Sequence, residues 1–186
     1  MNDTALAKME NLVWQEAVQA PAWVIRQARP QDAGLIHEMY SRLSADSLYY
    51  RYLRPYKPQL EEARQLASLD DDRGFALLAV INAKQPQVIG VAHYILSLED
   101  LSVAEPAVVV EDDWQGYGIG KALMAALAQE AAGHGVTYFR SAIHSLNARA
   151  LHMATYGPNP SKVHWEDGLM IVERRLQENP FTKSAV

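Results

Sequence analysis

Apolar residues at the start of the chain recur at helical spacing. The stretch before Pro21 places its apolar residues three or four positions apart: Leu6, Met9, Val13 and Ala17. This spacing predicts an amphipathic helix, and we expect residues 1–22 to be a helical extension of the main domain. Two interpretations stay open, a loosely packed terminal helix or an arm that gates the substrate or contacts a second copy in a homodimer.

The pattern of the next part of the chain predicts one strand followed by helices. The predicted elements are a strand over residues 23–25 and helices over 30–43, 47–53 and 60–69, the last two separated by Pro55 and Pro58. The first helix begins with Pro30 and Asp32, which are typical start and cap residues. The first third of the chain is therefore expected to be a strand followed by helices.

Apolar runs rich in β-branched residues predict strands in the remainder. The predicted strands cover residues 75–81, 88–96, 103–110, 136–143, 163–165 and 169–176. The polar connection 82–87 and the Asp167-Gly168 pair are hairpin signals, so the strands on either side of each should be antiparallel.

Two helices interrupt these strands. The first follows a glycine-rich run and ends near Gly133 and Gly135, and the second covers residues 147–155. The inner stripe of the first would be Ile119, Leu123, Met124, Leu127 and Ala131. The order of elements predicts an α/β protein with one mixed sheet in a single domain over residues 23–178, followed by a tail over residues 179–186.

Composition narrows the class of protein. The chain has 186 residues, of which 49% are hydrophobic and 21% charged, as in one ordinary globular domain. It lacks an apolar run of about 18 residues and a signal peptide, so we expect a soluble, cytoplasmic protein. A net charge of −5 argues against an electrostatic nucleic-acid binder and tolerates a cationic partner such as an amine. Neither a nucleic acid nor a membrane is expected as a partner.

Several kinds of catalytic site are excluded by residue type. The chain contains no cysteine, which excludes a thiol nucleophile and cysteine-based zinc sites. The six histidines form no H-E-x-x-H motif and no close pair backed by a carboxylate, so no metal site is expected. Without a G-x-S-x-G elbow, a serine hydrolase is unsupported.

The glycine-rich run is the most informative stretch. Gly116, Gly118 and Gly120 alternate between a strand end and a helix start. Such a junction suits a phosphate, because glycine lets the backbone approach closely and the N–H groups of the first helical turn favour an anion. A dinucleotide fingerprint would need glycine where Lys121 stands, and a Walker loop would need it where Gln115 stands. A tight turn that needs glycine for steric reasons alone is the alternative.

The same run carries a resemblance to a known family. The pattern Q-x-x-G-x-G at Gln115, Gly118 and Gly120 resembles the acetyl-CoA-binding motif of the GNAT superfamily of N-acetyltransferases. Residues 43–52 resemble an LS-x-x-S-x-Y-x-R-F segment of bacterial protein lysine acetyltransferases of the Pat type, and residues 89–94 resemble their third strand. The resemblance implies a GNAT-like fold, with a central, mostly antiparallel sheet, splayed fourth and fifth strands and flanking helices.

The resemblance also implies acetyl-CoA as the acyl donor, bound between the splayed strands. The main chain of the fourth strand would bond the pantetheine arm, and backbone amides of the glycine-rich loop would hold the pyrophosphate. Pro106 fits such a strand, because proline gives up a ladder donor. Asn147 resembles the second cofactor motif, although it could equally cap a helix. The cofactor-binding positions carried over are Val108, Val109, Val110, Gln115, Gly116, Tyr117, Gly118, Ile119, Gly120, Lys121 and Asn147.

Acetyl transfer needs a base near the acceptor. A lysine-like amine has a pKa near 10.4 and is almost fully charged at pH 7, so a carboxylate must accept its proton. Glu105 is the candidate, because it lies just before the cofactor strand segment, where Pat-like members often carry an acid; a strand-edge glutamate without a catalytic role is the alternative. Glu111, Asp112 and Asp113 are expected to pair with the following helix N-terminus instead.

The resemblance further implies an acid for the departing CoA thiolate. Many superfamily members carry a tyrosine seven residues after the helix asparagine, but Ala154 stands there. Tyr156 is the candidate in its place, and its alternative role is to end the helix. A thiolate is a tolerable leaving group at neutral pH even without this acid.

The acceptor side is expected around the second helix. Its aromatic residues Tyr49, Tyr50 and Tyr52 cannot all face inward, so at least one should be exposed. His93 and Tyr94 either line the acceptor cleft or form an ordinary half-buried strand pair.

The expected function is direct transfer of an acetyl group from acetyl-CoA to a primary amine, with a protein lysine favoured by the resemblance. No acetyl-cysteine intermediate can form. A small-molecule amine acetyltransferase and a non-catalytic acetyl-CoA-binding sensor are the alternatives.

Overall fold

The computed structural model describes residues 22–70, 72–81, 84–155 and 161–176. The expected N-terminal helix and the C-terminal tail lie outside these ranges. The described residues form one seven-stranded sheet in the order β1-β2-β3-β4-β5-β7-β6. Its strands are β1 (Trp23–Gln27), β2 (Gly74–Ile81), β3 (Gln87–Leu96), β4 (Val103–Val110), β5 (Tyr138–Ile143), β6 (Ser161–Glu166) and β7 (Leu169–Arg175).

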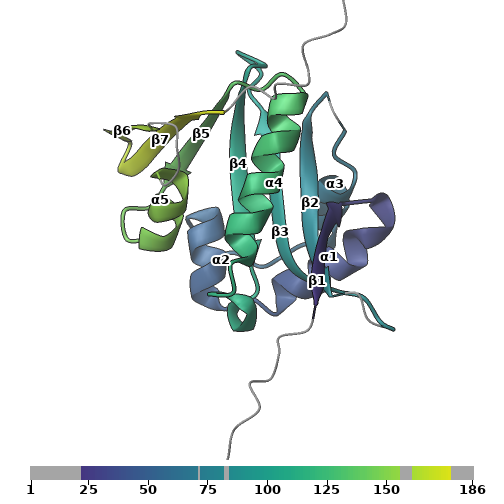
Figure 1. Ribbon diagram of the computed structural model, residues 1–186. Helices are drawn as coiled ribbons and strands as arrows, with labels where there is room; N and C mark the ends of the chain where they lie inside the picture. Colours follow the sequence, from purple (N-terminus) through teal and green to yellow (C-terminus); the bar gives the residue numbers. More distant parts are fainter. Residues whose placement is uncertain (1–21, 71, 82–83, 156–160, 177–186) are drawn as a thin grey trace, which may run out of the picture.

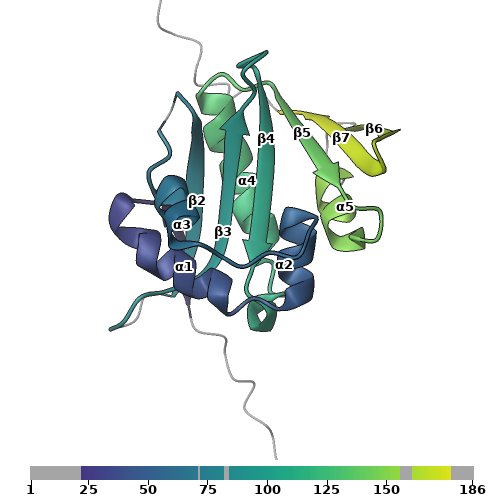
Figure 2. The same ribbon diagram turned by 180° about the vertical axis from the view of Figure 1, so that it is seen from behind.

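Helices cover both faces of the sheet (Figures 1 and 2). The helices are α1 (Ala33–Ser41), α2 (Ala45–Tyr52), α3 (Leu60–Ala67), α4 (Ile119–Gly133) and α5 (Ala148–Thr155), with short 3-10 turns at Pro30–Asp32 and Asp112–Trp114. Helices α1 and α3 pack on one face and α4 packs on the other, so each face has its own core. None of the helices in the described ranges is long and apolar enough to cross a membrane.

The predicted inner stripe of α4 is confirmed. Ile119, Leu123, Leu127 and Ala131 are almost fully buried, and Met124 packs partly against the same core. The apolar spacing of this helix therefore determines which side it turns to the sheet. The glycine-rich loop connects the end of β4 to the N-terminus of α4.

The sheet is antiparallel except between β4 and β5, which confirms the predicted mixed, mostly antiparallel sheet. These two parallel strands pair only at Val103 with Tyr138 and at Ala104 with Phe139. Beyond that point β5 pairs with β7 and diverges from β4, as Figure 2 shows. The edge of β4 from Glu105 onward is therefore open on the β5 side.

Candidate active site

The open edge of β4 presents alternate backbone groups. The Glu111 N–H donates to the Ile89 carbonyl at 2.9 Å. Because neighbouring residues of an antiparallel ladder point their backbone groups in opposite directions, the backbone of Val109 faces β3, and that of Val108 and Val110 faces the gap. Pro106 falls in the same set, so its missing N–H would point to the unpaired side and leaves no ladder bond unmade.

Side chains of β4 are divided between the two faces. Val108 and Val110 pack toward α4, whereas Val109 is buried in the core beneath α1 and α3. Glu105 shares the face of Val109 and is exposed. The acidic side chain and the open backbone edge therefore lie on one short segment, the six residues from Glu105 to Val110.

The glycine-rich loop turns from the end of β4 into α4. Gly116 and Gly118 have φ of 87° and 82°, in the left-handed region that glycine adopts without strain. Gly118 is the N-cap of α4 and has no side chain to cap it, and the first backbone bond of the helix runs from Ala122 to Gly118. The N–H groups of residues 119–121 precede that bond, which makes this turn a fitting site for a diphosphate.

Gln115 connects three elements around this loop. Its amide nitrogen donates to the Val110 carbonyl at 3.1 Å and to the Ser47 hydroxyl at 3.3 Å. Its amide oxygen accepts a hydrogen bond from Arg149 of α5. Gln115 thus joins β4, α2 and α5, and brings an exposed cation beside the loop.

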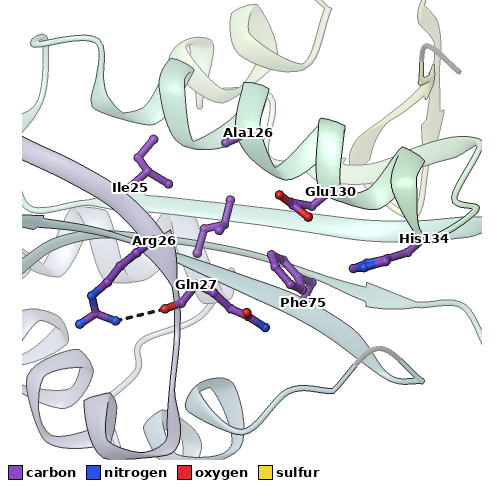
Figure 3. Close-up of a pocket in the computed structure, with 8 residues that line it drawn as sticks. Ile25, Arg26, Gln27, Phe75, Ala126, Glu130 and His134 are labelled. Atoms are coloured by element: carbon purple, nitrogen blue, oxygen red, sulfur yellow. Dashed lines mark hydrogen bonds between the residues drawn. The ribbon is translucent and has the colours of Figure 1, made fainter. Parts of the chain in front are cut away.

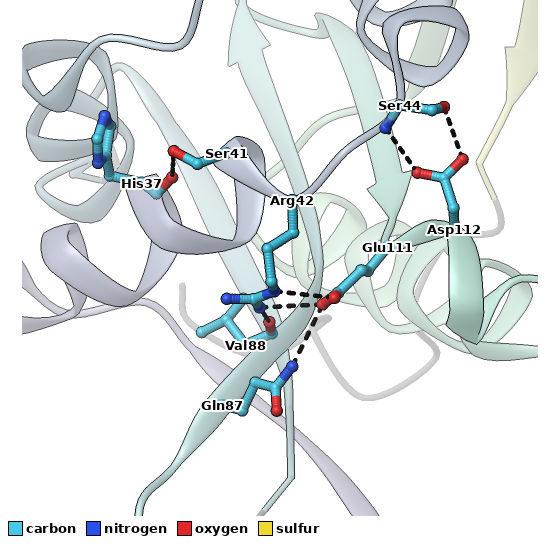
Figure 4. A network of polar contacts seen from close by, with 8 residues as sticks. All are labelled: His37, Ser41, Arg42, Ser44, Gln87, Val88, Glu111 and Asp112. Atoms are coloured by element: carbon cyan, nitrogen blue, oxygen red, sulfur yellow. Dashed lines mark hydrogen bonds and ion pairs between the residues drawn. The ribbon is translucent and has the colours of Figure 1, made fainter.

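The acidic run before the loop is used differently from the expectation (Figure 4). Glu111 is buried and forms a two-pronged ion pair with Arg42, at 2.8 and 2.9 Å. Asp112 accepts hydrogen bonds from the start of α2, at Ser44 and Ser47. The predicted pairing of these two residues with the helix that follows them is therefore wrong, since both bind the α1–α2 segment instead.

The two residues expected beside the acceptor cleft point to opposite faces. His93 lies on the Glu105 face of the sheet, opposite Ala107 of β4. Tyr94 is fully buried on the α4 face, where its hydroxyl lies 2.9 Å from His134 Nδ1. Tyr94 therefore does not line the acceptor side, because adjacent strand residues alternate between faces.

Aromatic rings lie where α2 approaches β5. Tyr49 and Tyr50 are exposed, as the helix pattern predicted, and both rings lie about 6 Å from the His144 ring at the end of β5. Tyr52 turns inward and packs against Tyr40. The exposed rings border the gap between β4 and β5 on the Glu105 face.

Asn147 serves as the N-cap of α5, one of its two predicted roles. Its side-chain oxygen accepts a hydrogen bond from the Ala150 N–H at 3.1 Å. Tyr156, the candidate acid, lies outside the described residues. No group of three His, Asp or Glu side chains that could hold a metal occurs within the described ranges.

A hollow of about 530 Å³ lies elsewhere, between β1, β2 and α4 (Figure 3). Ile25, Phe75 and Leu77 line it from the sheet, and Glu130 and His134 line it from α4. It opens on the α4 face, so the sheet separates it from Glu105.

Sequence reasoning missed the polar contacts that join distant segments. Arg149, Ser44 and Ser47 were not among the expected site residues, although all three contact the loop region. The Ser-x-x-Ser spacing at 44–47 is a helix-cap signal, and Arg149 stands two positions after Asn147. Those local signals could have drawn attention to them, but not to their partners.

Comparison with known proteins shows which family the chain resembles. Residues 37–157 match the model of the acetyltransferase (GNAT) family. A curated acetyltransferase of Pseudomonas aeruginosa is 29% identical over 126 residues, which are 65% of this chain and 66% of that protein. The chain thus spans just under two thirds of that relative's length.

Two solved structures have the same fold. The GNAT domain of S. lividans PAT is 23% identical, with a TM-score of 0.74, and the match covers 84% of this chain and 97% of that domain. YncA from Salmonella typhimurium, a putative acetyltransferase solved with its cofactor acetyl-CoA, is 24% identical with a TM-score of 0.57 over 86% of this chain and 95% of its own. With the family model spanning well over half of its length, this chain belongs to the GNAT family of acetyltransferases.

Proposed function

We propose that the chain transfers an acetyl group from acetyl-CoA directly to a primary amine, that this amine is the side chain of a protein lysine, and that Glu105 accepts its proton. The observation that carries this proposal is the exposed carboxylate of Glu105 on the segment of β4 that opens toward β5. Acetyl-CoA is the cofactor named for the Salmonella protein of this fold.

The donor side is supported by two features of the backbone. Val108 and Val110 turn their backbone groups toward the gap, as a strand-like pantetheine arm would need, although the Val110 carbonyl already accepts from Gln115. The N–H groups of residues 119–121 suit the diphosphate, with the cations of Lys121 and Arg149 at the same loop. The thioester supplies an acetyl group that is already activated toward amines.

Glu105 is suited to the proton transfer by its position and its lack of a competing partner. Within the described ranges its side chain makes no hydrogen bond or ion pair, so its carboxylate is available. It takes one proton from the acceptor ammonium, directly or through a water, and leaves the nitrogen lone pair free to attack. A C–N bond then forms, the C–S bond breaks, and its electron pair leaves with sulfur. The nitrogen gives up its second proton and the thiolate takes up one, so the products are the amide and the CoA thiol. Protonation of that thiolate by Tyr156 stays a prediction from the sequence.

A lysine acceptor is supported by the exposure of Glu105 and by the aromatic rings where α2 approaches β5. The side chain is exposed, so an amine carried on a protein surface can reach it. Tyr49, Tyr50 and His144 offer ring faces along which an unbranched aliphatic chain can lie, and aromatic faces attract an ammonium group.

The test measures CoA release from acetyl-CoA with a lysine peptide, with polyamines and with free amino acids. Release with the peptide alone supports the proposal, and release with small amines alone overturns its acceptor class. Glu105→Gln should lower kcat by about 10²- to 10⁴-fold while leaving acetyl-CoA binding unchanged.

Glu99→Gln is the matched control, because Glu99 is another exposed glutamate, in the β3–β4 turn. It should leave kcat unchanged. Equal rates for Glu105→Gln and the wild type would remove the base role from Glu105. Acetyl-CoA binding without turnover on any amine would favour a non-catalytic sensor.

A further inference from the structure

Arg51 and His93 form a part-buried contact on the face of the sheet that carries Glu105. Arg51 lies on α2, and its Nη2 is 3.2 Å from His93 Nε2 on β3. His93 is 6% exposed. The guanidinium also lies over the ring of Tyr52, 4.9 Å from its centroid. Arg51 is thus held in place from two sides.

The charge at this contact belongs to Arg51 alone. Burial, and then the neighbouring guanidinium, lower the pKa of His93 to about 3, so the imidazole is neutral. Arginine has only donors, so Nε2 accepts and the ring proton lies on Nδ1. His93 Nδ1 and Arg51 Nε are both buried without a hydrogen-bond partner among the described residues.

The groups around Arg51 offset this charge only in part. They are Tyr40 of α1, Tyr52 of α2, Tyr56 of the α2–α3 connection, Glu62 of α3 and His93 of β3. In addition, Arg54 lies over the Tyr56 ring, and Glu105 of β4 is on the same face of the sheet. Within the described ranges no carboxylate lies within ion-pair distance of Arg51. Glu62 accepts instead from the hydroxyls of Tyr52 and Tyr56, and the guanidinium lies over the Tyr52 ring.

The Arg51–His93 contact lies next to the proposed base. His93 is opposite Ala107, and Glu105 is two positions along β4 on the same face. Such diagonal neighbours are about 7–8 Å apart in an antiparallel pair. An amine that reaches Glu105 therefore approaches a fixed positive charge.

We propose that Arg51 is an electrostatic determinant of the acceptor site, which disfavours the ammonium form of the bound acceptor and so raises the fraction of neutral, reactive amine. This inference rests on the proposed acetylation of an amine. A second positive charge near Arg51 is repelled, so the bound amine loses its proton at a lower pH than it does in water. At about 8 Å, the order of the spacing between His93 and Glu105, and an effective dielectric constant near 20, a unit charge moves such a titration by roughly 1 to 1.5 pH units.

The test compares pH profiles of kcat at saturating acetyl-CoA and lysine peptide. Arg51→Gln removes the charge, so the rise of kcat with pH should move about one pH unit higher. Arg51→Lys keeps a charge there and should keep the profile close to that of the wild type. Glu62→Gln removes the counter-charge that Tyr52 and Tyr56 hold near Arg51 and should move the rise to lower pH.

Arg64→Gln is the matched control, since Arg64 is an exposed arginine of α3 that pairs with Glu61. It makes the same change of net charge and should not move the profile. Lysine peptide labelled at the ε-carbon, bound with CoA in a dead-end complex, gives a second readout through the NMR titration of its amine.

The outcomes distinguish a failure of this inference from a failure of the proposed function. Suppose that the wild type acetylates the peptide and that Arg51→Gln and Glu62→Gln both have the pH profile of the wild type. The proposed role of Arg51 is then wrong, and the proposed function is unaffected. If Arg51→Gln fails to fold, the Glu62→Gln profile decides alone. A wild type without amine-dependent CoA release overturns both proposals.

Discussion

Ser44 donates two hydrogen bonds to the carboxylate of Asp112, one from its backbone nitrogen at 2.9 Å and one from its hydroxyl at 2.8 Å. Ser47 donates a third from its hydroxyl at 2.8 Å, and a fourth group at this junction, the Gln115 amide, lies 3.3 Å from the same hydroxyl. The N-terminus of α2 and the start of the glycine-rich loop therefore share one anchor. Helix α2, on the proposed acceptor side, and the loop proposed to bind the donor are therefore held together at this point.

The first prediction concerns this anchor. Asp112→Ala leaves the first turn of α2 without its external acceptor and frees the loop, so the free energy of unfolding should fall by about 1 kcal/mol. The KM for acetyl-CoA should rise several-fold, because the loop must then be ordered on binding. Thermal melts and initial rates measure the two effects.

Asp113→Ala is the control for this substitution. Asp113 is the adjacent, equally exposed aspartate, and within the described ranges its side chain makes no hydrogen bond or ion pair. It should leave both quantities unchanged. An identical KM for acetyl-CoA in the two variants would mean that the anchor does not act on the loop.

The second prediction concerns the ion pair of Arg42 with Glu111. Glu111 is 7% exposed, and breaking its pair leaves a charge in a nearly water-free place. Arg42→Met or Glu111→Gln alone should lower the free energy of unfolding by about 2–3 kcal/mol, less than for a fully buried pair, because a third of the Arg42 side chain is exposed. The double variant should lose much less than the sum of the two, as a double-mutant cycle by urea unfolding would measure.

Arg140 and Glu166 provide the comparison, since their pair is 2.6 Å long but both side chains are nearly half exposed. Removing this pair should change the free energy of unfolding by no more than about 1 kcal/mol. Equal coupling energies for the two pairs would contradict the role given to burial.

Local chemistry made much of the fold predictable. The strand 103–110 and the turn at Asp167 and Gly168 have the structure expected from their own residues, since apolar runs and the turn pair act within a few positions. The loop that precedes α4 was likewise visible in its alternating glycines. Such signals need no knowledge of what packs against them.

Contacts between distant segments were not predictable in the same way. Arg42 meets Glu111 across 69 positions, and Arg51 meets His93 across 42. These pairs arise from how α1 and α2 pack over the sheet, which no spacing in the sequence encodes. For the same reason the acids after β4 were assigned to the nearest helix along the chain rather than the nearest in space.

The third prediction is a pH dependence centred on Asp32. Two hydrogen bonds from Arg26, both 2.7 Å, hold the pKa of this carboxyl below its usual range, against the opposing effect of burial. A carboxyl whose folded pKa is depressed adds stability above its unfolded pKa, near 3.9, and loses it as the pH falls through the folded value. The gap in melting temperature between wild type and Asp32→Asn should therefore be constant from pH 7 to about 5 and shrink below about 4. A gap that stays the same down to pH 3 would rule out an ionic contribution from Asp32.

The fourth prediction uses two glycines at opposite ends of α4. Gly118 and Gly135 have φ of 82° and 88°, and a Cβ atom at either would meet no neighbour within 4 Å. Alanine at either position should therefore cost about 1 kcal/mol of stability through backbone strain alone. Only Gly118 lies in the loop proposed to hold the diphosphate, so Gly118→Ala should also weaken acetyl-CoA binding tenfold or more, and Gly135→Ala should not. Isothermal titration with acetyl-CoA separates the two, and equal binding by both variants would move the diphosphate away from this turn.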